Sequence, residues 1–174
     1  MAGVRPFRIW RPKPSFPGWA ICQDSGMAKQ DIDVRRTISA DPDTVFRLVG
    51  DSSTWPDWTP IESFQLIEEG DLGGVGEIRV FRTGRVRVRE EIVEKVRGRR
   101  LVYELLSGLA VKDYRAEIDI EPSAAGSEVR WHTTFSPKFP GSGWIYRRAL
   151  QKATEQFVGG LAERAEGGVS VQAT

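Results

Sequence analysis

The sequence has little that would tie it to a metal, a membrane or a charged partner. Its 174 residues include one cysteine and one histidine, and 25 basic residues balance 24 acidic residues. The lone Cys22 permits no disulfide within the chain, which fits the reducing cytoplasm, where we expect the protein to act. Apolar runs fall well short of the ~20 residues of a membrane span, so we expect no integral membrane association. The near-zero net charge gives no general attraction to nucleic acid.

The same scarcity argues against several kinds of catalytic site. A nucleophilic triad needs an inward histidine, and strand parity directs His132 outward, next to Trp131. One histidine and one cysteine do not supply the usual ligand set of zinc, so we expect no metal. The run Gly73–Gly76 resembles a phosphate-binding loop, but no lysine-serine pair and no helix follow it. We interpret this run as a hairpin turn and expect no cofactor.

The N-terminal part of the chain differs in composition from the rest. Residues 1–26 hold four of the ten prolines, two of the six tryptophans and Cys22, without the period of a strand or a helix. We predict an irregular, disordered arm over residues 1–30, a single domain over residues 31–166 and a flexible tail over residues 167–174. The arm is either a dispensable extension or a docking peptide that uses Trp10 and Trp19.

Hydrophobic periodicity predicts an α+β domain with seven strands. A strand over residues 31–39 leads to Asp41-Pro42, where the aspartate can cap a helix and the proline can take its first position. A short helical turn over residues 53–58 follows. Six further strands are predicted over residues 61–68, 77–82, 86–96, 100–106, 111–120 and 128–135, with connections short enough for an antiparallel meander. A helix over residues 143–165, ended by Gly167-Gly168, is long enough to cross a curved sheet.

Alternation along the last strands predicts a sheet with one covered face and one wet face. Ala116, Ile118 and Ile120 share the inward side with Tyr114, and Val129, Trp131, Thr133 and Phe135 do the same on the next strand. The covering helix offers a stripe of Ile145, Ala149, Ala153, Phe157 and Leu161. Because this stripe contains small residues, two interpretations stay open: large sheet residues fill the space, or a cavity remains for a ligand.

Several polar side chains share the inward parity, which a dry core would avoid. They are Arg36, Glu90, Tyr103, Tyr114 and Thr133. A lone buried charge costs several kcal/mol, so Arg36 and Glu90 each need a partner, a ligand group or water. An ion pair between these two residues, or their exposure at a strand end, would explain them without a ligand. The basic residues Arg79, Arg82, Arg85, Arg87 and Arg89 are interpreted as a solvent-facing row.

A resemblance to a known family rests on short features that follow one another along the chain. They are Ile38-Ser39-Ala40-Asp41-Pro42 before Val45-Phe46, Gly50-Asp51 before Trp55-Pro56-Asp57-Trp58, Arg89-Glu90-Glu91-Ile92, Arg100-Leu101-Val102-Tyr103, and Gly126 before Val129-Arg130-Trp131. Residues 31–165 in this respect resemble the Bet v 1-like, START-related helix-grip superfamily (SRPBCC), and within it the polyketide cyclase/dehydrase-like proteins. The resemblance implies a curved seven-stranded antiparallel sheet that grips a long C-terminal helix, with two short helices between the first two strands. It also implies that Trp55 and Trp58 lie at the rim of a hydrophobic cavity.

Two functions follow from this cavity. The first is the binding, transport or sequestration of a small hydrophobic or aromatic molecule, such as a lipid or a polyketide, by Trp55, Trp58, Phe64, Tyr103, Tyr114, Trp131, Thr133, Ala153 and Phe157. The second is a cyclase or dehydratase activity, with Glu90, Tyr114 or Arg36 as candidate acid–base or oxyanion-binding residues. A third interpretation, a modulator of partner proteins, ranks last because the outward faces are highly charged. We expect a monomer or a homodimer.

Overall fold

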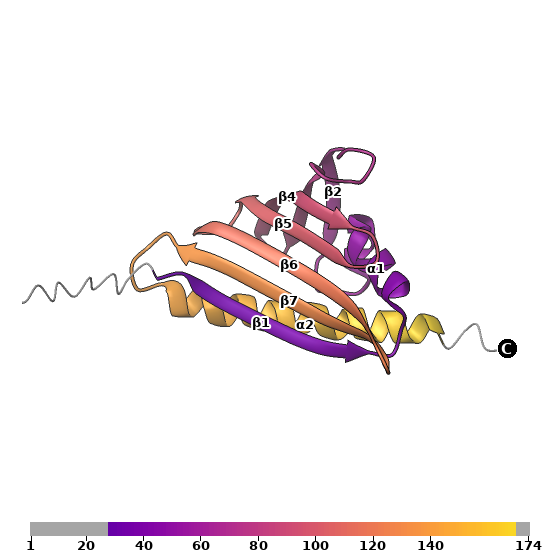
Figure 1. Ribbon diagram of the computed structural model, residues 1–174. Coiled ribbons are helices and arrows are strands. Elements are labelled where there is room, and N and C mark those ends of the chain that lie inside the picture. The colour runs from indigo at the N-terminus through magenta and orange to yellow at the C-terminus, as the bar shows by residue number, and fades with distance from the viewer. Residues whose placement is uncertain (1–27, 170–174) are drawn as a thin grey trace, which may run out of the picture.

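Seven antiparallel strands form one curved sheet, and a long helix crosses its concave face (Figure 1). The computed structural model describes residues 28–169, so the predicted arm and the end of the predicted tail lie largely outside the described residues. The sheet order is β1-β7-β6-β5-β4-β3-β2. The elements are β1 (Gln30–Ile38), α1 (Pro42–Gly50), the 3-10 helix η1 (Ser52–Asp57), β2 (Ser63–Glu68), β3 (Ile78–Thr83), β4 (Val86–Val96), β5 (Arg100–Ser107), β6 (Val111–Ser123), β7 (Gly126–Pro137) and α2 (Gly143–Val169). This arrangement confirms the predicted helix-grip fold.

Local side-chain chemistry starts both short helices where the sequence predicts them. The Asp41 carboxylate accepts a hydrogen bond from the Thr44 backbone N–H (2.9 Å), and Pro42 takes the first helical position of α1. Asp51 does the same for η1 by accepting from the Ser53 N–H (3.0 Å). Each carboxylate satisfies a backbone donor that has no partner inside its helix. The two helices close one end of the sheet.

The helix α2 departs from the prediction in two ways. It runs through Gly167 to Val169, so the predicted stop at Gly167-Gly168 is wrong. Glycine lowers helix stability by about 1 kcal/mol but does not by itself end a helix. The predicted inward stripe is wrong in its first half, because Ile145 and Ala149 are exposed whereas Tyr146 and Leu150 pack inward. A strict spacing of four residues drifts by about 40° per step around a helix of 3.6 residues per turn, so it leaves the covered face.

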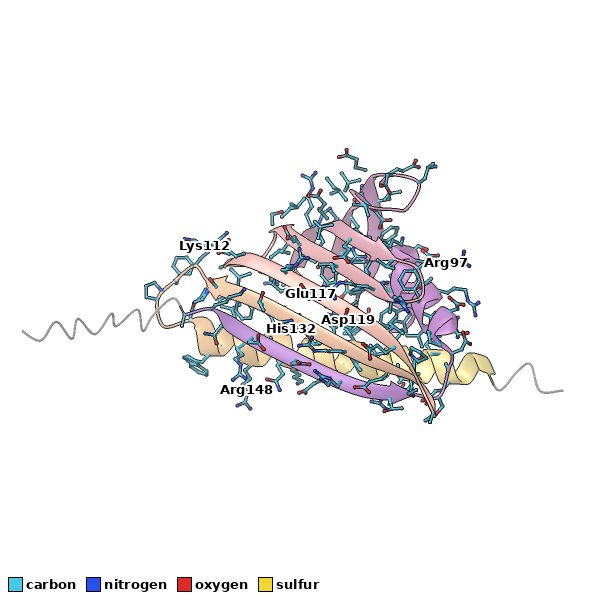
Figure 2. The ribbon with its side chains drawn as sticks, viewed as in Figure 1. Arg97, Lys112, Glu117, Asp119, His132 and Arg148 are labelled. Carbon is cyan, nitrogen blue, oxygen red and sulfur yellow. The ribbon has the colours of Figure 1, made fainter. Side chains whose placement is uncertain are left out.

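The outer face of the sheet carries charged side chains, as the alternation of β6 and β7 predicts. Arg130 donates two hydrogen bonds to Asp33 (2.9 and 2.7 Å), and His132 lies 2.8 Å from Asp31. Glu117 and Asp119 lie on the same outer face (Figure 2) and form ion pairs with neighbouring arginines. The Arg130 hydrogen bond holds the pKa of Asp33 below its ordinary value. The concave face is therefore left for apolar packing and for the site.

Candidate functional site

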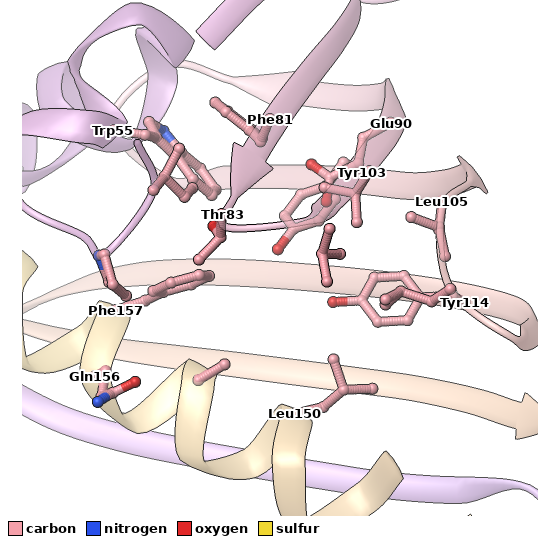
Figure 3. A pocket seen from close by; sticks show the side chains of 16 residues that line it. Trp55, Phe81, Thr83, Glu90, Tyr103, Leu105, Tyr114, Leu150, Gln156 and Phe157 are labelled. Atoms are coloured by element: carbon pink, nitrogen blue, oxygen red, sulfur yellow. The ribbon is translucent and has the colours of Figure 1, made fainter. Parts of the chain in front are cut away.

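A cavity of about 360 Å³ lies between the concave face of the sheet and the first half of α2 (Figure 3). Its wall is mostly apolar, and β3–β6, α2 and the segment after η1 all contribute to it. This volume falls at the lower end of the range for small-molecule sites. The lining residues are Trp55, Pro60, Ile61, Phe81, Thr83, Val86, Val88, Glu90, Tyr103, Leu105, Leu109, Tyr114, Leu150, Ala153, Gln156 and Phe157.

Aromatic rings close the cavity on the side of η1. The Trp55 ring centroid lies 5.2 Å from that of Phe81, 5.6 Å from that of Trp131 and 6.3 Å from that of Phe157. The Trp55 indole N–H donates to the Val49 carbonyl oxygen (3.0 Å), which fixes the ring. Beyond these rings, Val158, Leu161, Ala162 and Ala165 of the second half of α2 pack into the core, and the hollow beside Gly159, Gly160 and Glu163 is an open one at the surface of the helix. The aromatic cluster thus separates a hollow region from a filled one.

A buried ion pair forms one polar corner of the cavity. Arg79 is 0% exposed, and its Nε and Nη2 both donate to Glu90 Oε2, at 3.2 and 3.1 Å. Its Nη1 donates to Ser52 Oγ (2.8 Å), and Ser52 in turn donates to Glu77. The guanidinium also lies over aromatic rings, 4.5 Å from the Trp55 centroid and 4.8 Å from that of Tyr103. Charge pairing and cation–π contacts together compensate the loss of water around Arg79.

The carboxylate of Glu90 is only partly used by this ion pair. Within the described residues its second oxygen, Oε1, has no hydrogen-bond partner, and Glu90 lines the cavity. Burial raises the pKa of Glu90, while the charge and hydrogen bonds of Arg79 act in the opposite direction. An oxygen in this state accepts a hydrogen bond from a ligand and can also take up a proton.

Two tyrosine hydroxyls point into the same space as Glu90 (Figure 3). Burial raises the pKa of both Tyr103 and Tyr114, so both phenols stay protonated and available as donors. The negative charge of Glu90 adds to the rise for each of them. Behind them, Thr133 Oγ1 is buried without a partner among the described residues. The site therefore combines an apolar wall with one acceptor and two donors.

The structure brings only some of the predicted site residues to this cavity. Trp55, Tyr103, Tyr114, Ala153, Phe157 and Glu90 line it. Trp55 is buried, so it forms an inner wall and not an exposed rim as expected. Trp58 lies outside the cavity lining on the far side of Trp55, with their ring centroids 5.3 Å apart. Trp131 and Thr133 are core residues behind the wall, and Phe64 packs on the Phe81 ring (5.8 Å between centroids).

Arg36 is placed differently from its prediction. It is exposed and lies near Gly159 of α2, so it neither lines the cavity nor reaches Glu90. The proposed pairing of Arg36 with Glu90 is wrong, because Arg79 occupies that role. A long arginine side chain near a sheet edge can extend past the helix to water, and parity alone does not exclude this.

Arg79 is the residue that sequence reasoning missed, since it was assigned to a solvent-facing row. The signal that could have found it is the two-residue hairpin turn Gly84-Arg85. A two-residue turn there sets the β3–β4 register, in which Thr83 pairs with Val86 and Arg79 pairs with Glu90. Opposite charges that face each other on the covered side of a sheet are then expected to form an ion pair.

Comparisons with known proteins agree with this geometry. Residues 29–166 match the family model described as polyketide cyclase / dehydrase and lipid transport. The chain belongs to this family. Its fold places it in the Bet v 1-like helix-grip superfamily, as the sequence features predict. None of the curated proteins matches the sequence.

Solved structures with the same fold are distant in sequence. The di-domain ARO/CYC protein StfQ from the steffimycin biosynthetic pathway superposes with a TM-score of 0.71 at 14% identity, over 82% of this chain and 52% of that one. The major latex-like protein 151 of Panax ginseng gives 0.63 at 16% identity, over 80% and 97%. XoxI of Bacillus cereus gives 0.63 at 21% identity, over 80% and 94%. At these identities the likeness concerns the fold alone.

Proposed function

We propose that this member of the family binds a small, uncharged, mostly aromatic or otherwise hydrophobic molecule in the cavity. The observation that carries the proposal is the combination of an apolar wall with Glu90 Oε1 and the hydroxyls of Tyr103 and Tyr114. Arg79 already balances the charge of Glu90, so a charged ligand would bring an uncompensated charge into an apolar space. A polyketide or a lipid that carries hydroxyl or carbonyl groups fits this chemistry. A cytoplasmic location and a monomeric or homodimeric state remain predictions from the sequence.

Two neighbouring alanines on α2 allow a matched test of the proposal. Ala153 lines the cavity, whereas Ala149, one turn earlier, is exposed. The full chain is titrated with 2-naphthol by calorimetry, as wild type, Ala153→Phe and Ala149→Phe. We expect Ala153→Phe to weaken binding at least about tenfold by filling the space, and Ala149→Phe to bind like wild type. Equal affinity in all three proteins would refute binding in this cavity.

A second candidate function is a cyclase or dehydratase activity in the same cavity. Its support is that the buried carboxylate of Glu90, whose pKa is raised, and the protonated hydroxyl of Tyr114 line the same cavity. An aldol-type ring closure needs a base to remove a proton next to a carbonyl and a donor to hold the enolate oxygen. Incubation with a linear poly-β-ketone thioester separates the functions, because a carrier returns the compound unchanged. Turnover that is lost in both Glu90→Gln and Tyr114→Phe would establish the enzyme; turnover that both variants retain would exclude these residues as its acid–base pair.

A further inference from the structure

The connection from β7 into α2 exposes a group of large apolar side chains. Phe139 is 62% exposed, Trp144 is 68% exposed and Ile145 is 52% exposed. They lie within seven consecutive residues. A second such group, Leu66, Ile67 and Leu72, lies at the end of β2 and in the loop after it, and the remaining exposed residues (Val86, Val96 and Leu106) are spread over β4 and β5. We call Phe139, Trp144 and Ile145 the Trp144 patch. Exposed apolar groups of this size indicate a surface that is covered by something else.

A tight turn holds the Trp144 patch in place. The Ser142 backbone N–H and its hydroxyl both donate to the Phe139 carbonyl oxygen, at 3.2 and 2.8 Å. Gly141 has a φ of +79°, the left-handed conformation that glycine adopts without strain. The Ile145 N–H then donates to the Ser142 carbonyl oxygen (3.2 Å), which starts α2. The patch is therefore a defined part of the fold.

Basic residues predominate around this patch, and one acidic residue, Glu155, lines the same surface hollow as Trp144, Arg148 and Lys152. Residues 138–154 contain Lys138, Arg147, Arg148 and Lys152 and no aspartate or glutamate. Trp144, Arg148 and Lys152 follow one another at four-residue intervals, so they lie along one face of α2. Within residues 28–169, no carboxylate lies within 4.0 Å of the charged nitrogens of Lys138, Arg148 or Lys152. Arg147 donates to the Asp31 carbonyl oxygen (3.2 Å), and Glu155, which accepts from Gln151 (3.0 Å), ends the basic stretch.

We propose that the Trp144 patch and its basic neighbours bind the surface of a membrane that contains anionic lipid. A tryptophan beside aliphatic and basic side chains suits the boundary between lipid headgroups and acyl chains. Each lysine or arginine near an anionic bilayer adds electrostatic attraction. Among residues 28–169, no helix is long and apolar enough to cross a membrane, so the contact is peripheral. The inference concerns the outer side of α2 and does not depend on what the cavity binds.

Charge favours this occupant over the two others that the chain itself offers. A second copy would place one basic patch against another, which costs electrostatic free energy. Residues 1–26 carry four basic residues and one acidic residue, so they too are repelled by the patch and attracted to an anionic surface. On the inner side of the same helical segment, Leu150 and Ala153 line the cavity. Docking through Trp144 would thus bring a wall of the cavity close to the lipid.

The test is a flotation assay of the full chain with vesicles of phosphatidylcholine, with or without about one-third phosphatidylserine. The charge reversal Arg148→Glu with Lys152→Glu is matched by Arg97→Glu with Arg99→Glu, which changes the net charge equally. Both control residues are exposed in the turn between β4 and β5, and Figure 2 shows Arg97 at the other end of the molecule from Arg148. We expect the first double variant to bind anionic vesicles at least about tenfold more weakly than wild type, and the matched control to lose about threefold or less. Trp144→Ala provides an independent readout, with an expected loss of about fivefold.

Salt gives a measurement that does not depend on any variant. Raising the NaCl concentration from about 0.1 M to about 0.5 M shortens the range of electrostatic attraction, so wild-type binding to anionic vesicles decreases. Circular dichroism confirms that each variant is folded before its binding is compared. Absence of vesicle binding by wild type, equal binding to neutral and anionic vesicles, or an equal loss in both double variants would overturn the proposal. In those cases the patch is covered by the N-terminal residues, a second copy or another protein.

Discussion

The two halves of α2 meet the same sheet and yet differ in what they enclose. The second half packs Val158, Leu161 and Ala162 into the main hydrophobic core, which also contains the aromatic cluster, and these three side chains are at most 1% exposed. The first half places Leu150 and Ala153 along the cavity, and Phe157 lines it from just past the middle of the helix. Each half contributes an alanine to its inward face, Ala153 in the first half and Ala162 in the second. Small side chains on the helix therefore do not decide which half is hollow. What differs is the opposing surface, because the Trp55, Trp131 and Phe157 rings cluster at the end of the cavity and fill the space there.

This comparison shows how one fold can hold a cavity beside a packed core. The core beside the cavity contains large aromatic rings, each of which buries about 150–250 Å². In the hollow half, the ion pair with Arg79 holds the Glu90 carboxylate in place, and Arg79 lies against the Trp55 ring. The rings and the ion pair thus act as the boundary of the cavity as well as part of the core.

The largest expected effect on stability comes from truncating one large side chain in each half. Trp131→Ala should lower the free energy of unfolding by about 3–5 kcal/mol, because it opens a cavity in the filled half. Leu150→Ala should cost only about 1–2 kcal/mol, since its side chain is half-buried and already borders an empty space. Denaturant unfolding monitored by circular dichroism measures both values. Equal costs for the two substitutions would contradict the distinction between filled and hollow halves.

The next effect concerns the Arg79–Glu90 ion pair at the boundary of the cavity. Arg79→Met should cost roughly 3 kcal/mol, because it leaves the buried Glu90 carboxylate without its partner. The cost is near the lower limit for such a change since Glu90, whose pKa is already raised, can take up a proton.

The matched control for this substitution is Arg82→Met on the same strand, where the arginine pairs with Glu62 at the surface. We expect a change of less than about 0.5 kcal/mol there. In a double-mutant cycle, Arg79→Met with Glu90→Gln should cost less than the sum of the single substitutions. Strict additivity would show that the two side chains do not stabilise each other.

A smaller effect comes from enlarging the two alanines. Ala162→Leu should destabilise the protein by about 1–3 kcal/mol, because Ala162 is 0% exposed in the filled half. Ala153→Leu should change stability by less than about 1 kcal/mol in either direction, since its new atoms enter the cavity. The two melting curves are compared under identical conditions. A loss for Ala153→Leu as large as that for Ala162→Leu would mean that the first half is packed as well.

The smallest effect is a loss of folding stability at alkaline pH, caused by two tyrosines that line the cavity. Tyr103 and Tyr114 have folded-state pKa values above the ordinary value of 10. The unfolded chain therefore loses these protons first, so their contribution to stability is complete below about pH 10 and decreases as the pH rises above it. Substituting both tyrosines by phenylalanine should reduce the loss of stability above about pH 10. An unchanged pH dependence in the double variant would show that these two groups do not cause it.

The fold could be predicted from the sequence because its signals are local. The Asp41-Pro42 helix start and the clean alternation along β6 and β7 depend on neighbours in the chain, and the structure confirms them. A β-bulge between Lys112 and Arg115 interrupts the pairing of β6 without moving Tyr114 off the inward face. The inward stripe of α2 was half wrong, since its rotation depends on how the whole helix lies across the sheet.

The site could be predicted only in part, because it depends on contacts between distant segments. Glu90 and Tyr114 face the cavity as parity predicts, and their roles there remain proposals. Predicting the ion pair of Arg79 requires the register of the β3–β4 hairpin. Predicting that Arg36 is exposed requires the position of α2 relative to the edge of the sheet. Trp55 lines the cavity whereas Trp131 lies behind its wall, and this difference depends on packing in three dimensions.

The central claim is that one half of the space under the sheet admits a guest and the other half does not. The most direct test is an NMR titration of the methyl-labelled full chain with 2-naphthol. We predict shifts of the Leu105, Leu109 and Leu150 methyl signals, with those of Val158 and Leu161 nearly unchanged. Shifts centred on Val158 and Leu161, or no saturable shift at any of these methyls, would contradict the account.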